Sequence, residues 1–414
     1  MDERPIRDDK EINPDVLGYI FEKYINQKQM GAFYTKEDIT GYNSRNTIIP
    51  RIFDIAKEKC EIAFEGDHSI WKLLQADPNR YIYEAVKKGV DLSLPKEIES
   101  GIKNVNKRTE WNKPASTDFA LPTEIWREVV ARRERYQEVF SKLANGEIRD
   151  INDFITYNLD IQQFAQDVIE TCEGPELLRA FWFAIENLTV LDPTSGSGAF
   201  LFAALNILEL LYEACLDRMQ DFVDAPLSTK HKQTEKYADF RIVLDRIAHH
   251  PNKRYFIYKS IIVKNLFGVD IMEEAVEICK LRLFLKLVAQ IDDVKLIEPL
   301  PDIDFNIRAG NSLVGFARME DYNTMFDNPL GLKTDADLMA ELLAKNVNDF
   351  HNQQLEQGSA DEELKKKITE QLEALTVRFN DQLRPVYGFK KNEAEQFIKT
   401  HQPFHWCIEF FSIM

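Results

Sequence analysis

The sequence predicts an α/β protein in which a doubly wound parallel sheet follows a helical N-terminal region and precedes a charged helical insertion. Residues 188–319 contain short apolar segments that end in acidic or glycine-rich turns, each followed by an amphipathic helical pattern; this alternation is typical of parallel sheets. Residues before 186 place apolar side chains at helical spacing, and residues 332–400 do so along one narrow stripe, as in a helical hairpin. We therefore expect three regions: 1–185, 186–319 and 320–414.

Composition favours a soluble, cytoplasmic protein. Of 414 residues, 44% are hydrophobic and 29% are charged. No apolar run approaches the roughly 18 residues that a membrane-spanning helix needs, so we expect no membrane contact. Residues 1–15 are polar and lack the apolar core of a secretory signal.

The net charge bears on possible partners. The chain has 52 basic and 69 acidic side chains, a formal net charge of −17. This balance repels phosphate at long range and, taken alone, argues against nucleic-acid binding. A basic face can nevertheless exist on an acidic protein, and a DNA-reading domain can lie outside this chain.

The cysteines and histidines indicate neither a disulfide framework nor a metal site. The five cysteines are odd in number, far apart and never in a CxxC pair, so we expect reduced, mostly buried thiols: Cys60, Cys172, Cys215, Cys279 and Cys407. His249 and His250 are adjacent. Without a third ligand nearby, this pair is expected to be exposed to solvent.

A glycine-rich turn follows the first strand candidate. Residues 188–191 run into DPTSGSGAFL, residues 192–201, and then into a very apolar helix. Gly196 and Gly198 lack a Cβ, so the backbone can turn sharply and approach a ligand, and the N–H groups of the helix N-terminus can face it. An ordinary glycine turn is the alternative. A GxGxxG dinucleotide motif fits less well, because Leu201 stands where its third glycine would be.

This segment resembles motif I of the N6-adenine DNA methyltransferases, DPxxGSGxFL. The resemblance implies a Rossmann-like class I methyltransferase core that binds S-adenosylmethionine. In that family the acid and the glycine loop hold the methionine end of the cofactor. Here those positions are Asp192, Gly196 and Gly198, with Phe200 closing the pocket.

A second strand candidate ends in an acid, as the same family requires. In NLFGVDI, residues 265–271, Asp270 lies where open α/β sheets bind ligands. Its carboxylate could accept hydrogen bonds from both ribose hydroxyls, and Ile271 could pack on the adenine ring. A purely structural acid is the alternative. The segment between the two motifs predicts a helical insertion.

A third strand candidate ends in GNSL, residues 310–313, which looks like motif III. Asn311 would meet the adenine edge of the cofactor, because an amide can both donate and accept hydrogen bonds. A polar turn after an edge strand is the alternative.

The N-terminal region carries a segment similar to motif X of the family. GAFYTK, residues 31–36, is followed by NTIIP, residues 46–50. Tyr34 and Thr35 would close over the methionine carboxylate. A helix cap at Thr35, with Glu37 and Asp38 in the first turn, is compatible with this role.

The catalytic motif of the family, (D/N)PP(Y/F/W), is not found. Its oxygen acceptors and aromatic ring would hold the flipped adenine. Asn328-Pro329 follows motif III but continues with Leu330 and Gly331. Residues 403–414, PFHWCIEFFSIM, resemble the segment that directly precedes this motif in large family members. We therefore expect no catalytic residue in this chain.

Together these motifs predict the cofactor-binding half of a DNA adenine-N6 methyltransferase of the large restriction or phage-defence type, such as type IIG, BREX or DISARM enzymes. The expected partners are DNA, contacted largely outside this chain, and a second polypeptide that carries the catalytic motif and target recognition. One alternative is a non-catalytic S-adenosylmethionine-binding subunit for assembly or sensing. Another is a methyltransferase for RNA or a small molecule.

Overall fold

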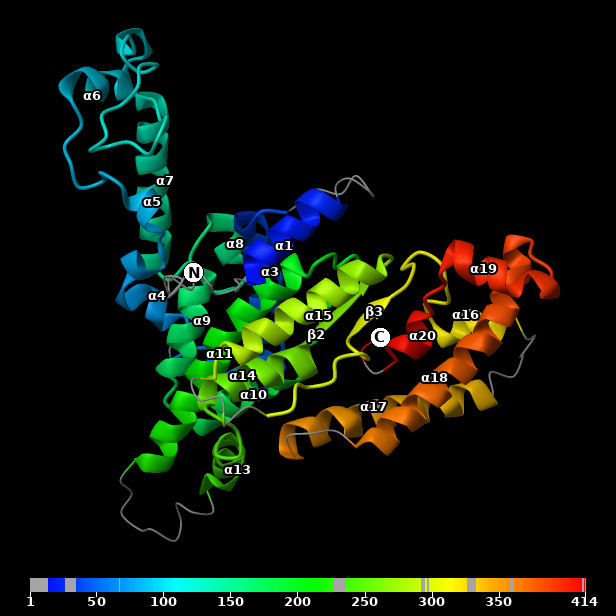
Figure 1. Ribbon diagram of the computed structural model, residues 1–414. Coiled ribbons are helices and arrows are strands. Elements are labelled where there is room, and N and C mark those ends of the chain that lie inside the picture. The colour runs from blue at the N-terminus through cyan, green and yellow to red at the C-terminus, as the bar shows by residue number, and fades with distance from the viewer. Residues whose placement is uncertain are drawn as a thin grey trace. The chain divides into compact units, whose positions relative to one another are not determined.

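The computed structural model describes residues 14–26, 35–66, 68–225, 236–291, 295, 298–325, 333–357, 361–411 and 413, and Figure 1 shows its ribbon. The chain divides into two compact units. Unit 1 consists of Met1–Ser44 and Ile185–Met414, and unit 2 consists of Arg45–Ala184. The parallel sheet lies in unit 1.

Unit 1 is built around three parallel strands. They are β1 (Val190–Asp192), β2 (Leu266–Asp270) and β3 (Ile307–Ala309). β2 lies in the centre, paired through Asp192↔Gly268 with β1 and through Asp270↔Ala309 with β3. All three strands were expected, because each is an apolar run that ends in an acidic or glycine-rich turn.

The doubly wound arrangement is not seen in the described residues. The spatial order β1-β2-β3 follows the chain order, so the sheet grows in one direction only. A doubly wound sheet needs later strands on the far side of the first, and no such strand is described beyond β1. The described strands therefore show winding in one direction only.

Helices cover both faces of this sheet. The described helices of unit 1 include α1 (Pro14–Phe21), α11 (Ala199–Asp224), α13 (Ala238–Ile247), α14 (Lys253–Ser260), α15 (Glu273–Val288), α16 (Met319–Thr324), α17 (Asp335–Gln357), α18 (Glu362–Leu383), α19 (Ala394–His401) and α20 (Trp406–Glu409). α11 and α15 connect successive strands and lie on one face, where Gly268 meets Leu201 of α11. Phe267 and Val269 point to the opposite face and pack against Phe404 and Phe410.

Helix α11 corrects the expectation that no segment has the length and apolarity of a membrane span. An 18-residue window of α11 has a mean hydropathy of 1.7. However, 72% of that window is buried inside the protein. Its apolarity is therefore explained by packing, since α11 contacts β1, β2 and α13.

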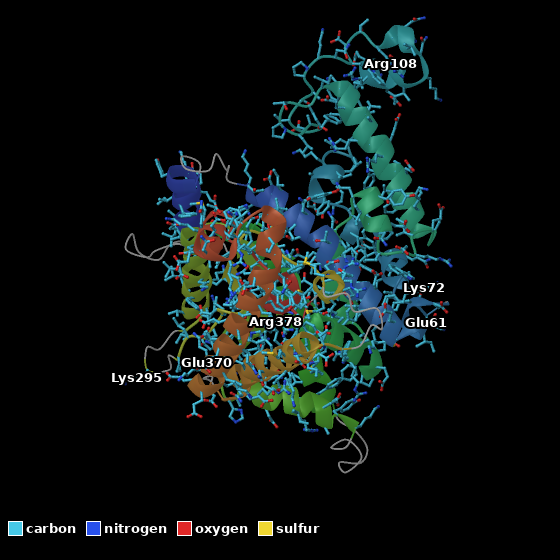
Figure 2. The ribbon with its side chains drawn as sticks, turned by 90° about the vertical axis from the view of Figure 1, so that its right-hand side faces the viewer. Glu61, Lys72, Arg108, Lys295, Glu370 and Arg378 are labelled. Carbon is cyan, nitrogen blue, oxygen red and sulfur yellow. The ribbon has the colours of Figure 1, made fainter. Side chains whose placement is uncertain are left out.

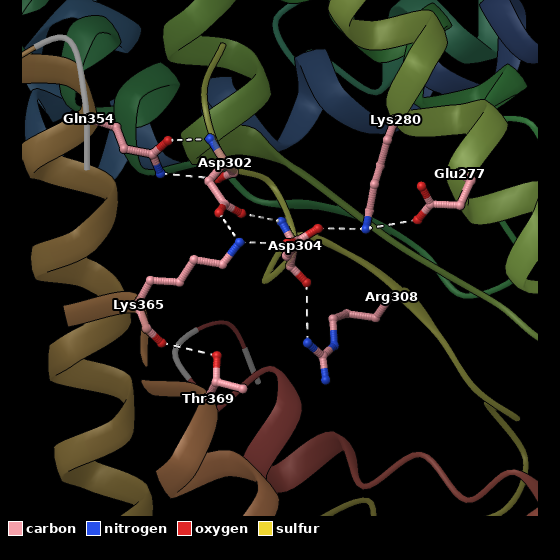
Figure 3. Close-up of polar contacts among 8 residues, drawn as sticks. All are labelled: Glu277, Lys280, Asp302, Asp304, Arg308, Gln354, Lys365 and Thr369. Atoms are coloured by element: carbon pink, nitrogen blue, oxygen red, sulfur yellow. Dashed lines mark hydrogen bonds and ion pairs between the residues drawn. The ribbon is translucent and has the colours of Figure 1, made fainter. Parts of the chain in front are cut away.

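Helices α17 and α18 form the expected hairpin, and polar contacts tie it to the sheet (Figure 3). Lys365 of α18 contacts Asp302 and Asp304, which precede β3, and Lys280 of α15 donates to Asp304 at 2.7 Å. Burial alone would raise the pKa of Asp304, but the hydrogen bonds from Lys280 and Lys365 outweigh it and lower the pKa to about 2. Gln354 of α17 adds hydrogen bonds to both backbone groups of Asp302.

The insertion before β2 is helical, as expected, and it corrects the prediction for His250. His249 is exposed, but His250 is 9% exposed and packs beside the rings of Tyr255 and Phe256. Its Nδ1 is 3.0 Å from a Glu298 carboxylate oxygen and its Nε2 is 3.0 Å from the Leu355 carbonyl oxygen. The partners are distant in sequence, so the pattern alone could not show this burial.

Unit 2 is helical in its described residues. It contains most of α3 (Glu37–Lys59), then α4 (Lys72–Ala76), α5 (Glu84–Lys87), α6 (Lys96–Lys103), α7 (Trp126–Ala144), α8 (Asp153–Tyr157), α9 (Ile161–Glu170) and most of α10 (Pro175–Asn187). Its core is aromatic. Phe53 and Trp71 each pack against Phe164, and Phe53 also packs against Phe181, all with ring centroids less than 6 Å apart. Residues 107–122 are rich in Asn, Thr, Ser and Pro, a composition that predicts a linker. After the 3-10 turn that ends at Lys107 they form a loop, but Trp111 is only 5% exposed and anchors this loop in a core.

Candidate functional site

The glycine-rich turn lies across the carboxyl end of β2. β1 ends at Asp192 and α11 begins at Ala199. Between them, the Ser195 N–H donates to the Val269 carbonyl oxygen at 2.8 Å. Gly196 and Gly198 have φ angles of +51° and +92°, which residues other than glycine rarely adopt. A Cβ on Gly198 would lie 2.7 Å from Cys279 Sγ, so glycine also permits α11 and α15 to pack closely.

Asp192 and Asp270 stand at the ends of neighbouring strands. The Asp270 carboxylate accepts from the Gly196 N–H at 2.8 Å and from the Met272 N–H at 2.9 Å. The Asp192 carboxylate accepts from the Thr194 N–H at 3.1 Å. Burial raises the pKa of Asp192; the hydrogen bond from Thr194 lowers it, and the negative charge of Asp270 raises it further. The two acids thus form one negative centre beside the turn.

Asn311 extends the same edge from β3. The Gly310 N–H donates to the Asp270 carbonyl oxygen at 2.8 Å, and the Asn311 N–H donates to the Gln402 carbonyl oxygen at 2.7 Å. The Asn311 side-chain oxygen accepts from the Leu313 N–H at 3.0 Å, so part of its capacity is used within its own turn. Asp192, Asp270 and Asn311 follow one another across the sheet.

Two further residues, which the sequence analysis missed, hold the glycine-rich turn from outside. Glu22, just after α1, is 7% exposed and its carboxylate accepts from the Ser197 N–H at 2.9 Å. Arg282 of α15 is 2% exposed. Its guanidinium donates to the Ser197 carbonyl oxygen at 2.6 Å and to the Pro14 carbonyl oxygen at 2.7 Å. The turn is therefore connected to α1 through two separate residues.

Two backbone N–H groups of the glycine-rich turn, just before α11, are already used within the protein. The Gly196 and Ser197 N–H groups both already donate to protein carboxylates. A signal for Arg282 did exist in the sequence: it is a charged residue on the apolar side of α15, three positions after Cys279. Nothing in the sequence around Glu22 singles it out.

The remaining predicted cofactor residues are placed less specifically. Phe200 is half-buried in the first turn of α11, and Ile271 is 41% exposed directly after Asp270. Thr35 is half-buried two residues before α3. Among the described residues it makes no polar contact with the glycine-rich turn. Tyr34 lies outside the described residues, as do Asn328 and Pro329.

The chemistry of this edge suits an organic ligand better than a metal ion. In the described ranges, no group of three His, Cys, Asp or Glu side chains could hold a metal. Cys279 lies beneath the turn, and burial raises the pKa of its thiol to about 12. A parallel sheet whose carboxyl edge carries a glycine-rich turn and acids is the arrangement that α/β proteins use for nucleotide-like ligands.

Comparisons with known proteins indicate which kind of α/β protein this chain resembles. Residues 264–414 match the model of the Eco57I restriction-modification methylase family. The chain is 28% identical over 318 residues to a protein of Methanocaldococcus jannaschii described as "Putative type II restriction enzyme and methyltransferase". That alignment covers 74% of this chain but only 17% of the relative. No solved structure is a significant match. The two matches support a methyltransferase of the restriction-modification type.

Proposed function

We propose that this chain is the cofactor-binding part of an S-adenosylmethionine-dependent DNA methyltransferase that modifies adenine at N6 in a restriction-modification or phage-defence system. The observation that carries the proposal is that Asp192, Asp270 and Asn311 lie at or just after the carboxyl ends of three neighbouring strands, next to a turn with two left-handed glycines. Asp192 and Asn311 belong to the segments that resemble motifs I and III, and Asp270 ends the strand between them.

The residues present fit this cofactor. Asp192 and Asp270 lie close enough for the charge of one to raise the pKa of the other, and such a pair is stabilised by a ligand that brings hydroxyl donors or positive charge. The cofactor has both, in its ribose hydroxyls, ammonium and sulfonium groups. When bound, it supplies an electrophilic methyl group. Asp270 would accept from the ribose, Asp192 would face the methionine end, and Asn311 would meet the adenine edge.

The residues that hold the methyl acceptor would lie outside these 414 residues. The 414 residues contain no (D/N)PP(Y/F/W) motif, and the M. jannaschii relative extends far beyond the aligned part. We propose that the groups that hold the flipped adenine come from polypeptide outside these 414 residues, in a second polypeptide as expected or in a longer form of the same chain. A cofactor-binding assembly or sensing subunit is the second candidate, favoured by the same missing motif.

Calorimetric titration with S-adenosylmethionine tests the proposal. Asp270→Asn removes the charge while keeping the shape, and we expect it to abolish binding or weaken it by at least tenfold, about 1.4 kcal/mol. Asp349→Asn, at an exposed position of α17, is the matched control and should bind like the wild type. If the wild-type chain does not bind the cofactor, or if both variants bind equally well, the assignment of this edge is wrong.

A parallel assay separates the two candidate functions. Radiolabelled methyl transfer to adenine-containing duplex DNA is measured with the chain alone and after addition of a polypeptide that carries an NPPY motif. Transfer only in the mixture supports the methyltransferase. Cofactor binding without transfer in either case favours the assembly or sensing subunit.

A further inference from the structure

The N-terminal end of helix α7 packs against a small substructure that has no role in the proposed function. It consists of α6, the 3-10 turn Val105–Lys107 and the first part of the loop that leads to Trp126. We call residues 96–113 the tip. Figure 1 shows α6 at one end of α7, and α4 towards the other.

The tip has its own core. Trp111 is 5% exposed and packs with Ile98 and Val130, and its indole N–H donates to the Ile98 carbonyl oxygen at 3.0 Å. A Cβ on Gly101 would lie 2.4 Å from the indole nitrogen, so only glycine permits this packing. Arg108 lies over the indole ring, 4.1 Å from its centroid, and donates to the Gly101 carbonyl oxygen at 2.8 Å. The backbone of the tip is therefore held in place.

The outer surface of the tip is basic, in contrast to the chain as a whole. Residues 100–109 include three basic side chains and no acid, whereas the chain has a net charge of −17. Lys103 and Lys107 are exposed and have no ion-pair partner within this described part of unit 2. Between them Val105 is 70% exposed, and the Asn104 side chain accepts from the Asn106 N–H at 3.0 Å.

Acidic side chains lie at the borders of this surface. Glu97 and Glu99 are exposed on α6, and Glu110 is bound to Lys113 at 2.7 Å. They do not interrupt the segment from Lys103 to Lys107. Residues 103–107, with two lysines, two asparagines and one valine, are thus an exposed surface without acids, next to the core that Trp111 forms.

We propose that this surface contacts the sugar-phosphate backbone of double-stranded DNA. Lysine and asparagine side chains are common donors to phosphate oxygens, and an exposed apolar side chain between them can lie in a groove. A chain with an excess of acids must meet DNA where acids are missing, because phosphate is repelled elsewhere. The identification of DNA as the partner rests on the proposed function, whereas the existence of the basic surface does not depend on that function.

The test is fluorescence anisotropy of the full chain with a labelled DNA duplex over a range of salt concentrations. Lys103→Gln/Lys107→Gln is expected to weaken binding about tenfold and to reduce the slope of log K against log salt by about 1.8, the value for two lost phosphate contacts. The matched control is Lys57→Gln/Lys72→Gln, which removes the same charge from exposed positions elsewhere in unit 2. Figure 2 labels Lys72 and, in the tip, Arg108.

Equal affinities for the tip variant and the control, or no DNA binding by the wild type, would overturn the proposal. Preferential binding of RNA or of an acidic protein through the same lysines would overturn it as well. Cofactor titration of the tip variant keeps the two proposals apart, since its affinity for S-adenosylmethionine should equal that of the wild type. DNA binding through the tip without any cofactor binding would refute only the proposed function.

Discussion

Replacement of Arg282 by methionine tests how strongly the glycine-rich turn is anchored. Among its contacts, the guanidinium donates to the Pro14 carbonyl oxygen at 2.7 Å, to the Ser197 carbonyl oxygen at 2.6 Å and to the Ser197 hydroxyl at 3.2 Å. It also lies 4.3 Å from the centroid of the Phe202 ring. Methionine keeps an apolar stem against that ring but cannot donate a hydrogen bond.

The expected loss in the free energy of unfolding follows from these contacts. Hydrogen bonds to charged groups contribute roughly 1.5 to 3 kcal/mol each, and the cost of burying the guanidinium offsets part of the sum, which leaves a net loss of about 3 kcal/mol. Urea denaturation followed by circular dichroism measures this loss. Arg135→Met, at an exposed position of α7, is the control and should change stability by less than about 0.5 kcal/mol.

Cofactor affinity gives a second measure of the same anchor. Because Arg282 positions Ser197 without lying at the strand ends, we expect Arg282→Met to weaken S-adenosylmethionine binding while leaving some binding detectable. A loss of stability below about 1 kcal/mol would show that the contacts of Arg282 do not hold the turn. Unchanged cofactor affinity would show that Arg282 stabilises the turn without influencing the ligand site.

Two further predictions concern the turn and the acid sensitivity of the core. Gly198→Ala should destabilise the protein by about 2 to 4 kcal/mol through backbone strain and the contact with Cys279, whereas Gly66→Ala, at a φ of +74° in open space, should cost only about 1 kcal/mol in thermal or urea unfolding. Burial lowers the pKa values of His351 and His405 to about 4. As the pH falls, the unfolded chain therefore takes up protons on these histidines before the folded chain does. Their contribution to the free energy of unfolding should be fully present above pH 6.5 and be lost between pH 6.5 and about 4. His351→Phe should make that fall shallower in urea titrations at several pH values; an unchanged slope would show that His351 is not the titrating group.

Much of the fold could be predicted from sequence. The three strands of unit 1 combine an apolar run with a marked end: Asp192 and the glycines after β1, Asp270 after β2, and Gly310 after β3. The single stripe of apolar residues likewise predicted the hairpin of α17 and α18. Local pattern is sufficient in these cases because each element buries one face of its own sequence.

The parts that were missed depend on contacts between distant segments. Glu22 meets Ser197 across 175 positions, and His250 meets Leu355 across 105. The polar composition of residues 107–122 predicts a linker, but the buried Trp111 and a hydrogen bond from Arg132 to the Phe119 carbonyl oxygen hold this loop. The direction in which a sheet grows also depends on strands that lie elsewhere in the chain, so the three strand motifs alone could not determine it.

The hairpin of α17 and α18 leaves the sheet and returns to it at almost the same point. The Asn311 N–H donates to the Gln402 carbonyl oxygen and the Phe404 N–H donates to the Val314 carbonyl oxygen, both at 2.7 Å. A Cβ on Gly315 would clash with the Phe404 carbonyl oxygen, so the two passing segments are in direct backbone contact. Because the cost of closing a loop rises only with the logarithm of its length, the intervening stretch can be lengthened, shortened or exchanged for another domain during evolution while Asn311 keeps its place.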